Sequence, residues 1–323
     1  MKKIIVTVFA IALSLILMAC VQPEEHDVYV TVYPMEYVVD QLFIDTDLTA
    51  GMVPGVSSHN EAIDWSPKDI IAMGNADLLI YVGANFEYYI ESNGEEVFTN
   101  KNVALIKTEG NLVDFIPGIT HEHTDGEAHV DTDEHTLGLD PHFWVSPKRM
   151  ITVAQNVYNL LIDTYPEYES TITENYDQLM TKLQGLDSLF TTTISNQTRM
   201  IMTSTNLYSY LHEDYDLEYL PISPGYHEEA DQFTTAQKQE VVNEAVIHEI
   251  THIIYERNST SPLSTAVLST LQDLGYSVEK LEFIIMDALT IEDVKLNRDY
   301  LIIMNQNINV IKEASQDEGA NNG

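Results

Sequence analysis

The sequence is short of cysteine and of positive charge. One cysteine in 323 residues cannot form a disulfide within the chain, so the fold depends on its hydrophobic core. Lysine and arginine number 15 against 51 aspartate and glutamate residues, a formal net charge of −36 at pH 7. Such a chain repels nucleic acid and anionic lipid head groups, which excludes both as partners, and it concentrates cations near its surface. Charge alone does not distinguish cation capture from solubility in a salty medium.

The apolar run near the amino terminus is too short to span a membrane comfortably. Residues 4–17 carry no charge, but a bilayer span needs about 20 apolar residues. Lys2 and Lys3 precede this run and small residues follow it, which is the pattern of an export signal. Loss of the signal leaves 13 basic residues against 51 acidic ones, a net charge of −38.

The predicted export signal ends at the only cysteine. The sequence LMAC at residues 17–20 resembles the lipobox of bacterial lipoproteins, which implies that residues 1–19 are a signal peptide and that Cys20 is lipidated. Residues 20–27 would then be a tether, and the mature protein would lie outside the cytoplasm, anchored to the outer face of the cell membrane. The alternative is a cleaved signal that ends near a cysteine by chance.

Short apolar runs alternate with helical patterns along the rest of the chain. This alternation is typical of βαβ units and predicts two α/β lobes, each with a four-stranded parallel sheet. The predicted strands are 28–32, 48–53, 78–82, 103–107, 200–203, 217–222, 250–255 and 278–283. One apolar stripe over residues 166–193 predicts a long helix that packs on both lobes. We expect an N-terminal lobe at 28–165, a linker helix at 166–194, a C-terminal lobe at 195–314 and a disordered tail at 315–323.

The sequence HEITH at residues 248–252 matches the pattern of zinc metalloproteases. In that pattern two histidines on one helical face bind zinc and the glutamate activates water. The residues that follow are mostly β-branched or aromatic, which predicts a buried strand instead. His248 and His252 would then straddle a junction between helix and strand, at the end of the sheet away from ligand. A metallohydrolase stays open as an alternative.

Three potential metal ligands follow predicted strands in the two halves of the chain. His59 lies in the loop after the second strand, His142 follows the fourth strand and a long loop, and Asp287 follows the last strand. Because ligands bind beyond the carboxyl ends of strands in open α/β sheets, these residues are expected to converge between the lobes. Two imidazoles and a carboxylate suit zinc, with manganese possible where oxygen ligands dominate. Each residue could alternatively cap a turn or a helix.

Five segments resemble, in order and spacing, the metal-binding solute receptors of ABC importers, the zinc and manganese class. They are VTVYPMEYVV, PGVSSH, SPKDIIAMGNADLLIYVG, DPHFWVSP and RDYLIIMNQNI, and the resemblance covers about residues 26–313. It implies two α/β lobes joined by one long helix, a cleft that closes slightly around one ion, and delivery to a membrane permease. It also implies that His59, His142 and Asp287 are three of four metal ligands.

At the fourth ligand position the sequence departs from this class. Its members have a histidine or a glutamate where this chain has Thr205, and a neutral hydroxyl is a poor zinc ligand. Either water fills the position or another side chain enters. We expect His227 to be the fourth ligand, because its loop follows the neighbouring strand; Glu228, Glu229 and, less readily, His212 are the other candidates. His227 could alternatively be a surface histidine.

A histidine-rich segment covers residues 120–140. Histidines alternate there with acidic residues without apolar periodicity, which predicts a mobile loop. The four histidines are His121, His123, His129 and His135. Such tracts bind zinc or nickel more naturally than manganese, so we expect an accessory metal loop beside the site. The alternative is an acidic loop that picks up metal adventitiously.

The sequence as a whole predicts a monomeric, lipid-anchored zinc receptor with no catalytic role. Its cargo is expected to be Zn²⁺, with Mn²⁺ less favoured, and its partner the ABC permease of a zinc importer. A manganese receptor of the same class is the first alternative, and a HEITH-type zinc metallohydrolase is the second. A third is a lipoprotein adhesin, in which metal supports the structure and the function is cell adhesion.

Overall fold

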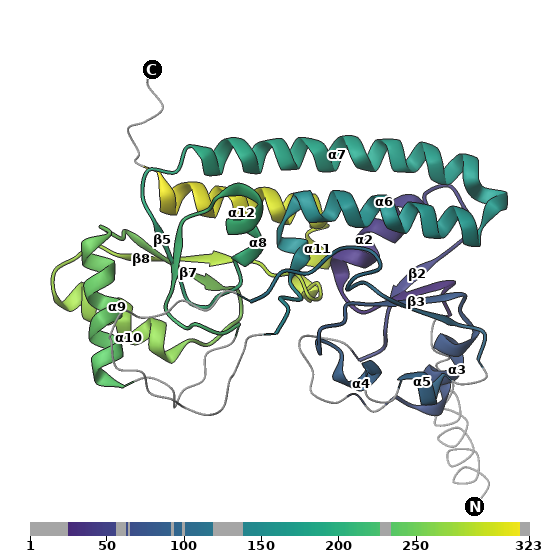
Figure 1. Ribbon diagram of the computed structural model, residues 1–323, viewed down its shortest axis with the longest axis horizontal. Helices are drawn as coiled ribbons and strands as arrows, with labels where there is room; N and C mark the ends of the chain where they lie inside the picture. Colours follow the sequence, from purple (N-terminus) through teal and green to yellow (C-terminus); the bar gives the residue numbers. More distant parts are fainter. Residues whose placement is uncertain are drawn as a thin grey trace, which may run out of the picture.

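The computed structural model describes residues 25–55, 63, 65–91, 94–98, 101–118, 138–226 and 234–316. This part of the chain forms two α/β lobes, with the long helix α7 running across both (Figure 1). The predicted fold class is confirmed: each lobe has a four-stranded sheet, and one long helix joins them. No helix among the described residues is both long and apolar enough to cross a membrane. The predicted signal peptide and Cys20 lie outside the described residues.

The first lobe is built on a parallel sheet in the strand order β2-β1-β3-β4. Its strands are β1 (Val28–Val30), β2 (Ala50–Met52), β3 (Leu78–Tyr81) and β4 (Ala104–Lys107). Its helices are α2 (Tyr33–Leu42), α3 (Pro67–Asn75), α4 (Tyr88–Glu91) and α5 (Gly94–Val97). Central strands β1 and β3 are almost wholly buried, as their apolar sequences require. Ser66 and Asp69 form a capping box that fixes the start of α3.

The second lobe repeats the same topology, with the strand order β6-β5-β7-β8. Its strands are β5 (Ile201–Thr203), β6 (Tyr219–Pro221), β7 (His252–Glu256) and β8 (Glu279–Phe283). Its helices are α8 (Ser209–Tyr215), α9 (Thr235–Ile247), α10 (Pro262–Asp273), α11 (Ile291–Lys295) and α12 (Tyr300–Ser315). All eight predicted strands occur, each within two residues of its predicted ends.

Long helices connect the lobes along one side of the molecule. The short helix η1 (Phe143–Val145) leads into α6 (Pro147–Thr164), and η2 (Pro166–Tyr168) leads into the 27-residue α7 (Glu169–Ser195). Figure 1 shows α7 extending over both lobes, with α6 and α12 beneath it. The sequence predicted α7 but not α6 or α12. Helix α7 is therefore the element that spans both lobes, and α6 and α12 pack against it.

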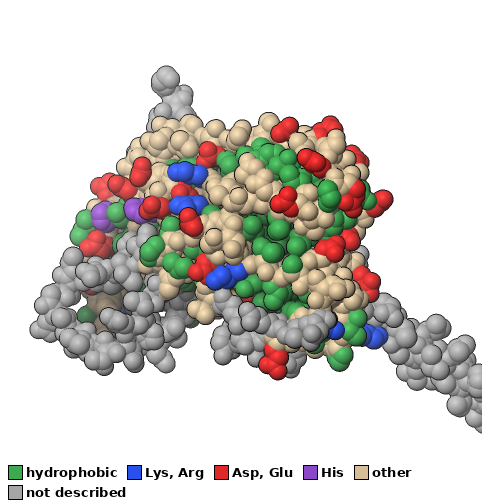
Figure 2. All heavy atoms as spheres, turned by 45° about the vertical axis from the view of Figure 1, so that its right-hand side comes forward, with side chains coloured by type: hydrophobic (Ala, Val, Ile, Leu, Met, Phe, Trp, Pro, Cys, Tyr) green, Lys and Arg blue, Asp and Glu red, His purple; other side chains and the backbone are tan. Residues whose placement is uncertain are grey.

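The hydrophobic core is continuous between the lobes. One cluster of buried side chains includes Val30 of β1, Leu183 of α7 and Phe283 of β8. Acidic side chains are spread over the face drawn in Figure 2, where basic ones are few. Ser315, the first residue of the predicted tail, is buried at the end of α12; residues 317–323 lie outside the described part.

Candidate metal centre

The carboxyl ends of the two sheets meet at backbone contacts. Tyr33, which follows β1, donates its backbone N–H to the carbonyl oxygen of Asp287, which follows β8, at 2.9 Å. The indole Nε1 of Trp144 donates to the carbonyl oxygen of Ile285 at 2.7 Å. The second-lobe loop that carries Asp287 is thus held against the first lobe. This is the region in which a parallel α/β fold binds ligands.

His142 is fully buried and held in one orientation by Asp140. Its ring nitrogen Nδ1 lies 2.8 Å from Asp140 Oδ1, and the same oxygen accepts the backbone N–H of His142 at 2.9 Å. A proton on Nδ1 that is donated to a carboxylate leaves Nε2 with its lone pair available to a metal ion. Asp140 is therefore the support that a metal-binding imidazole needs.

Aromatic rings from both lobes surround the His142 imidazole. Ring centroids of Trp144 and Phe86 lie 5.4 and 6.2 Å from it. The ring of Tyr226, in the second-lobe loop after β6, lies 5.1 Å away. Since Tyr226 directly precedes His227, this contact brings the start of the predicted fourth-ligand loop to His142.

Asp287 and His142 interact electrostatically from different lobes. Burial raises the pKa of the Asp287 carboxyl, and the charge of His142 opposes that rise. Of the predicted site residues, these two lie in the described part of the chain, as does the lesser candidate His212 of α8, whose Nδ1 lies 2.9 Å from the carbonyl oxygen of Leu217. His59, His227, Glu228, Glu229 and the histidines of the accessory loop lie outside it.

Thr205, at the position where the class has its fourth ligand, is bound to a carboxylate. Its hydroxyl donates to Oε1 of Glu256 at 2.8 Å, and the Ser204 hydroxyl donates to Oε2 at 2.5 Å. Glu256 is the last residue of β7 and is 7% exposed. Burial raises its pKa against the hydrogen bonds from Ser204 and Thr205 and the charge of His142.

Glu256 is not among the residues that the sequence predicted for the site. The signal that could have pointed to it is its position, because an acidic side chain ends a buried strand at the carboxyl end. Within the described residues, no group of three His, Cys, Asp or Glu side chains is close enough to hold a metal ion. Asp287, His142 and Glu256 alone are therefore not a complete site.

The HEITH segment lies at the opposite end of its sheet. Helix α9 ends at Ile247, His248 is its C-cap, and Glu249 takes a left-handed conformation with φ 51°. His252 begins β7, four residues before Glu256. The predicted junction between helix and strand is confirmed, and the two histidines do not share a helical face. His248 Nε2 instead lies 3.3 Å from an oxygen of Glu244, one turn earlier in α9.

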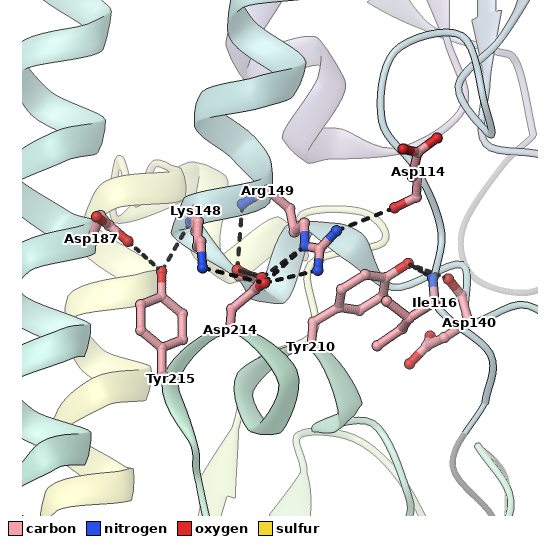
Figure 3. Close-up of polar contacts among 10 residues, drawn as sticks. Asp114, Ile116, Asp140, Lys148, Arg149, Asp187, Tyr210, Asp214 and Tyr215 are labelled. Atoms are coloured by element: carbon pink, nitrogen blue, oxygen red, sulfur yellow. Dashed lines mark hydrogen bonds and ion pairs between the residues drawn. The ribbon is translucent and has the colours of Figure 1, made fainter.

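An inter-lobe clamp holds the His142 segment from the second lobe (Figure 3). We define it as Asp214 and Tyr210 of α8 with their partners Ser146, Arg149 and Asp140. Asp214 Oδ2 accepts from the Ser146 hydroxyl at 2.6 Å and from Arg149 Nε at 2.8 Å. The Tyr210 hydroxyl donates to the carbonyl oxygen of Asp140 at 2.7 Å. These bonds lie on both sides of His142 and fix its place relative to α8.

Two parallel sheets under a long connecting helix, meeting where His142 and Asp287 interact, define a two-lobed solute-receptor fold. The chain belongs to the family described as Zinc-uptake complex component A periplasmic (ZnuA), whose family model matches residues 28–314. The resemblance to metal-binding receptors of ABC importers is confirmed at the level of the family.

Individual relatives are similar over nearly the whole chain. The zinc-binding lipoprotein AdcA of Streptococcus pneumoniae serotype 4 is 25% identical over 324 residues, which cover 99% of this chain and 62% of AdcA. The high-affinity zinc uptake system protein ZnuA of Bacillus subtilis is 26% identical over 293 residues, 89% of this chain and 86% of ZnuA. The solved Zn(II)-bound ZnuA-like domain of S. pneumoniae AdcA has a TM-score of 0.70 at 24% identity and covers 91% of this chain and 100% of that domain.

The match to AdcA covers most of this chain but only part of AdcA. This chain spans 55% to 62% of the length of the streptococcal AdcA proteins that it matches. It is therefore similar to one portion of those longer proteins.

Proposed function

We propose that this protein is an extracytoplasmic zinc receptor that binds one Zn²⁺ ion between its lobes and delivers it to an ABC permease. Membership of the zinc-uptake family supports this function, as do relatives named for zinc binding and zinc uptake. The structural observation that carries it is the buried His142, whose Nδ1 is fixed by Asp140 and whose segment binds the Asp287 loop of the other lobe through Trp144 and the carbonyl oxygen of Ile285. An imidazole with its second nitrogen bound to a carboxylate is the usual form of a zinc ligand.

We propose His59, His142, Asp287 and His227 as the ligands. Zinc prefers four ligands, and two imidazoles with one carboxylate leave one position open. The contact between Tyr226 and His142 supports His227 as the residue that fills it, because the two positions are adjacent in the chain. His121, His123, His129 and His135 are proposed as accessory groups that capture zinc near the site.

Replacing His227 with alanine should weaken zinc binding by at least about tenfold. A ligand next to an anchored residue loses less entropy on binding than one in a long polar segment, so His227 should contribute more than the accessory histidines. Deleting residues 121–135 should mainly reduce the number of weakly bound ions. Titration with a competing chelator would measure both. The assignment is reversed if the deletion destroys the tight site and His227→Ala binds like the parent.

The membrane anchor, the monomeric state and the absence of catalysis are also proposals. The name of the pneumococcal relative, a zinc-binding lipoprotein, supports an anchor at Cys20.

Zinc stoichiometry on the purified protein tests the receptor function. We expect one tightly bound Zn²⁺ per chain and weaker binding of Mn²⁺. Tighter binding of Mn²⁺ would favour a manganese receptor, and a partner surface that binds equally well without metal would favour an adhesin.

Replacing Glu249 with glutamine should change neither zinc stoichiometry nor zinc affinity. Its left-handed backbone ends the helix that a metalloprotease motif requires, and it lies at the amino end of β7. Calorimetry and a peptide-hydrolysis assay on the parent and the variant would check this. A chelator-sensitive peptidase activity in the parent that disappears in the variant would overturn the transport function.

A further inference from the structure

Glu256 is a buried acidic side chain that binds two neutral hydroxyls within the described part of the chain. It is 7% exposed, and its carboxylate accepts hydrogen bonds from the hydroxyls of Ser204 and Thr205. Those residues follow β5, which pairs in parallel with β7, so the carboxylate lies at the carboxyl ends of two central strands. Desolvation of an ionised carboxylate is costly unless an opposite charge is near.

The corresponding carboxylate of the first lobe is held differently. Glu87 accepts hydrogen bonds from the backbone N–H groups of Val82 and Gly83 at 2.8 and 2.9 Å and from the hydroxyl of Thr31, which follows β1. Backbone donors fix the loop after β3 and give Glu87 a structural role. The donors to Glu256 are hydroxyls, which can rotate to other acceptors. The two sheets have the same topology, so a carboxylate held by hydroxyls rather than by the backbone donors of a loop is a feature of the second lobe.

The same imidazole acts on Glu256 and on Asp287. The charge of His142 lowers the pKa of each carboxyl against the rise that burial causes. The three side chains come from β7, from the loop after β8 and from the segment before α6. Asp140, whose Oδ1 lies 2.8 Å from Nδ1 of His142, is a further buried carboxylate of the segment that carries this imidazole. Buried carboxylates favour a dication over a neutral solute.

We propose that Glu256 is an electrostatic partner of the zinc ion: a buried carboxylate, bound by the Ser204 and Thr205 hydroxyls at the position where the family has its fourth ligand, whose negative charge favours the bound cation. The inference rests on the proposed function, since it names a further residue of the same site. Glu256 acts on the ion through space and positions the Ser204 and Thr205 hydroxyls beside it. The cost of burying its charge is recovered when the ion binds.

The test is Glu256→Gln, which removes the charge and keeps the shape. A glutamine oxygen still accepts one hydroxyl, and its amide can donate to the other hydroxyl after that group rotates. We expect zinc affinity, measured against a competing chelator, to fall about 10- to 100-fold, the usual effect of losing a residue that supports metal ligands. We expect the thermal midpoint of the zinc-free protein to stay the same or rise, because a desolvated charge is gone.

Glu282→Gln is the matched control. Glu282 lies in the neighbouring strand β8, its side chain is 50% exposed, and it pairs with Lys280. The same chemical change there should alter neither zinc affinity nor the thermal midpoint of the zinc-free protein.

The outcomes separate the alternatives. Zinc affinity equal to that of the parent in Glu256→Gln overturns the inference and leaves the receptor function intact. A zinc-free Glu256→Gln protein that is less stable, or does not fold, also overturns it, because Glu256 would then be structural. A parent protein without one tight zinc site contradicts the proposed function instead.

Discussion

Alanine in place of His142 should weaken zinc binding by at least about 100-fold. His142 is fully buried, and Asp140 fixes its ring through Nδ1, so that Nε2 is the nitrogen proposed to bind the ion. Loss of His142, a proposed direct ligand, should cost more than loss of a residue that only supports a ligand. Calorimetry with Zn²⁺ on the purified, metal-free protein would measure the change.

The control for this variant is His248→Ala. His248 is the C-cap of α9 and contacts Glu244, so it lies away from the proposed site. It should bind zinc like the parent. Because His142 is buried, the thermal midpoint of the zinc-free His142→Ala protein must also be measured. A folded His142→Ala protein with unchanged zinc affinity would refute the assignment of the site.

Alanine in place of Asp214 should lower the free energy of unfolding by about 3 kcal/mol. Its side chain is 3% exposed and binds Ser146 and Arg149, so the substitution leaves a hydroxyl and a guanidinium without their acceptor. The Arg149 side chain is 21% exposed, so water can recover part of the loss. This keeps the expected cost at the lower end of the range for broken buried ion pairs. Urea unfolding would measure it.

Glu213→Ala is the comparison on the same helix. Glu213 is exposed, and its loss should change the free energy of unfolding by less than about 0.5 kcal/mol. A double-mutant cycle with Arg149→Ala would isolate the contribution of the ion pair between the lobes. If Asp214→Ala and Glu213→Ala were equally stable, the inter-lobe clamp would contribute nothing measurable.

The secondary structure of this chain could largely be predicted from the sequence, because its signals are local. The apolar runs of the eight strands and the stripe of α7 are short-range patterns, and their burial in two sheets and one shared core follows from them. The start of α9 also has a local signal, since Thr234 and Gln237 form a capping box there. Helix α6 was missed although Ser146 and Pro147 are a clear start signal.

The sequence by itself also placed His142 and Asp287 after strands, where ligands bind, and predicted that HEITH would not lie on a helix. It did not determine which side chains meet. Glu256 contacts Thr205 at a sequence separation of 51, and Asp214 contacts Arg149 at a separation of 65. Such contacts depend on strand order and on the packing of α8 against α6, which no local pattern specifies. Only the tertiary structure decided that a buried carboxylate lies behind the position where the family has its fourth ligand.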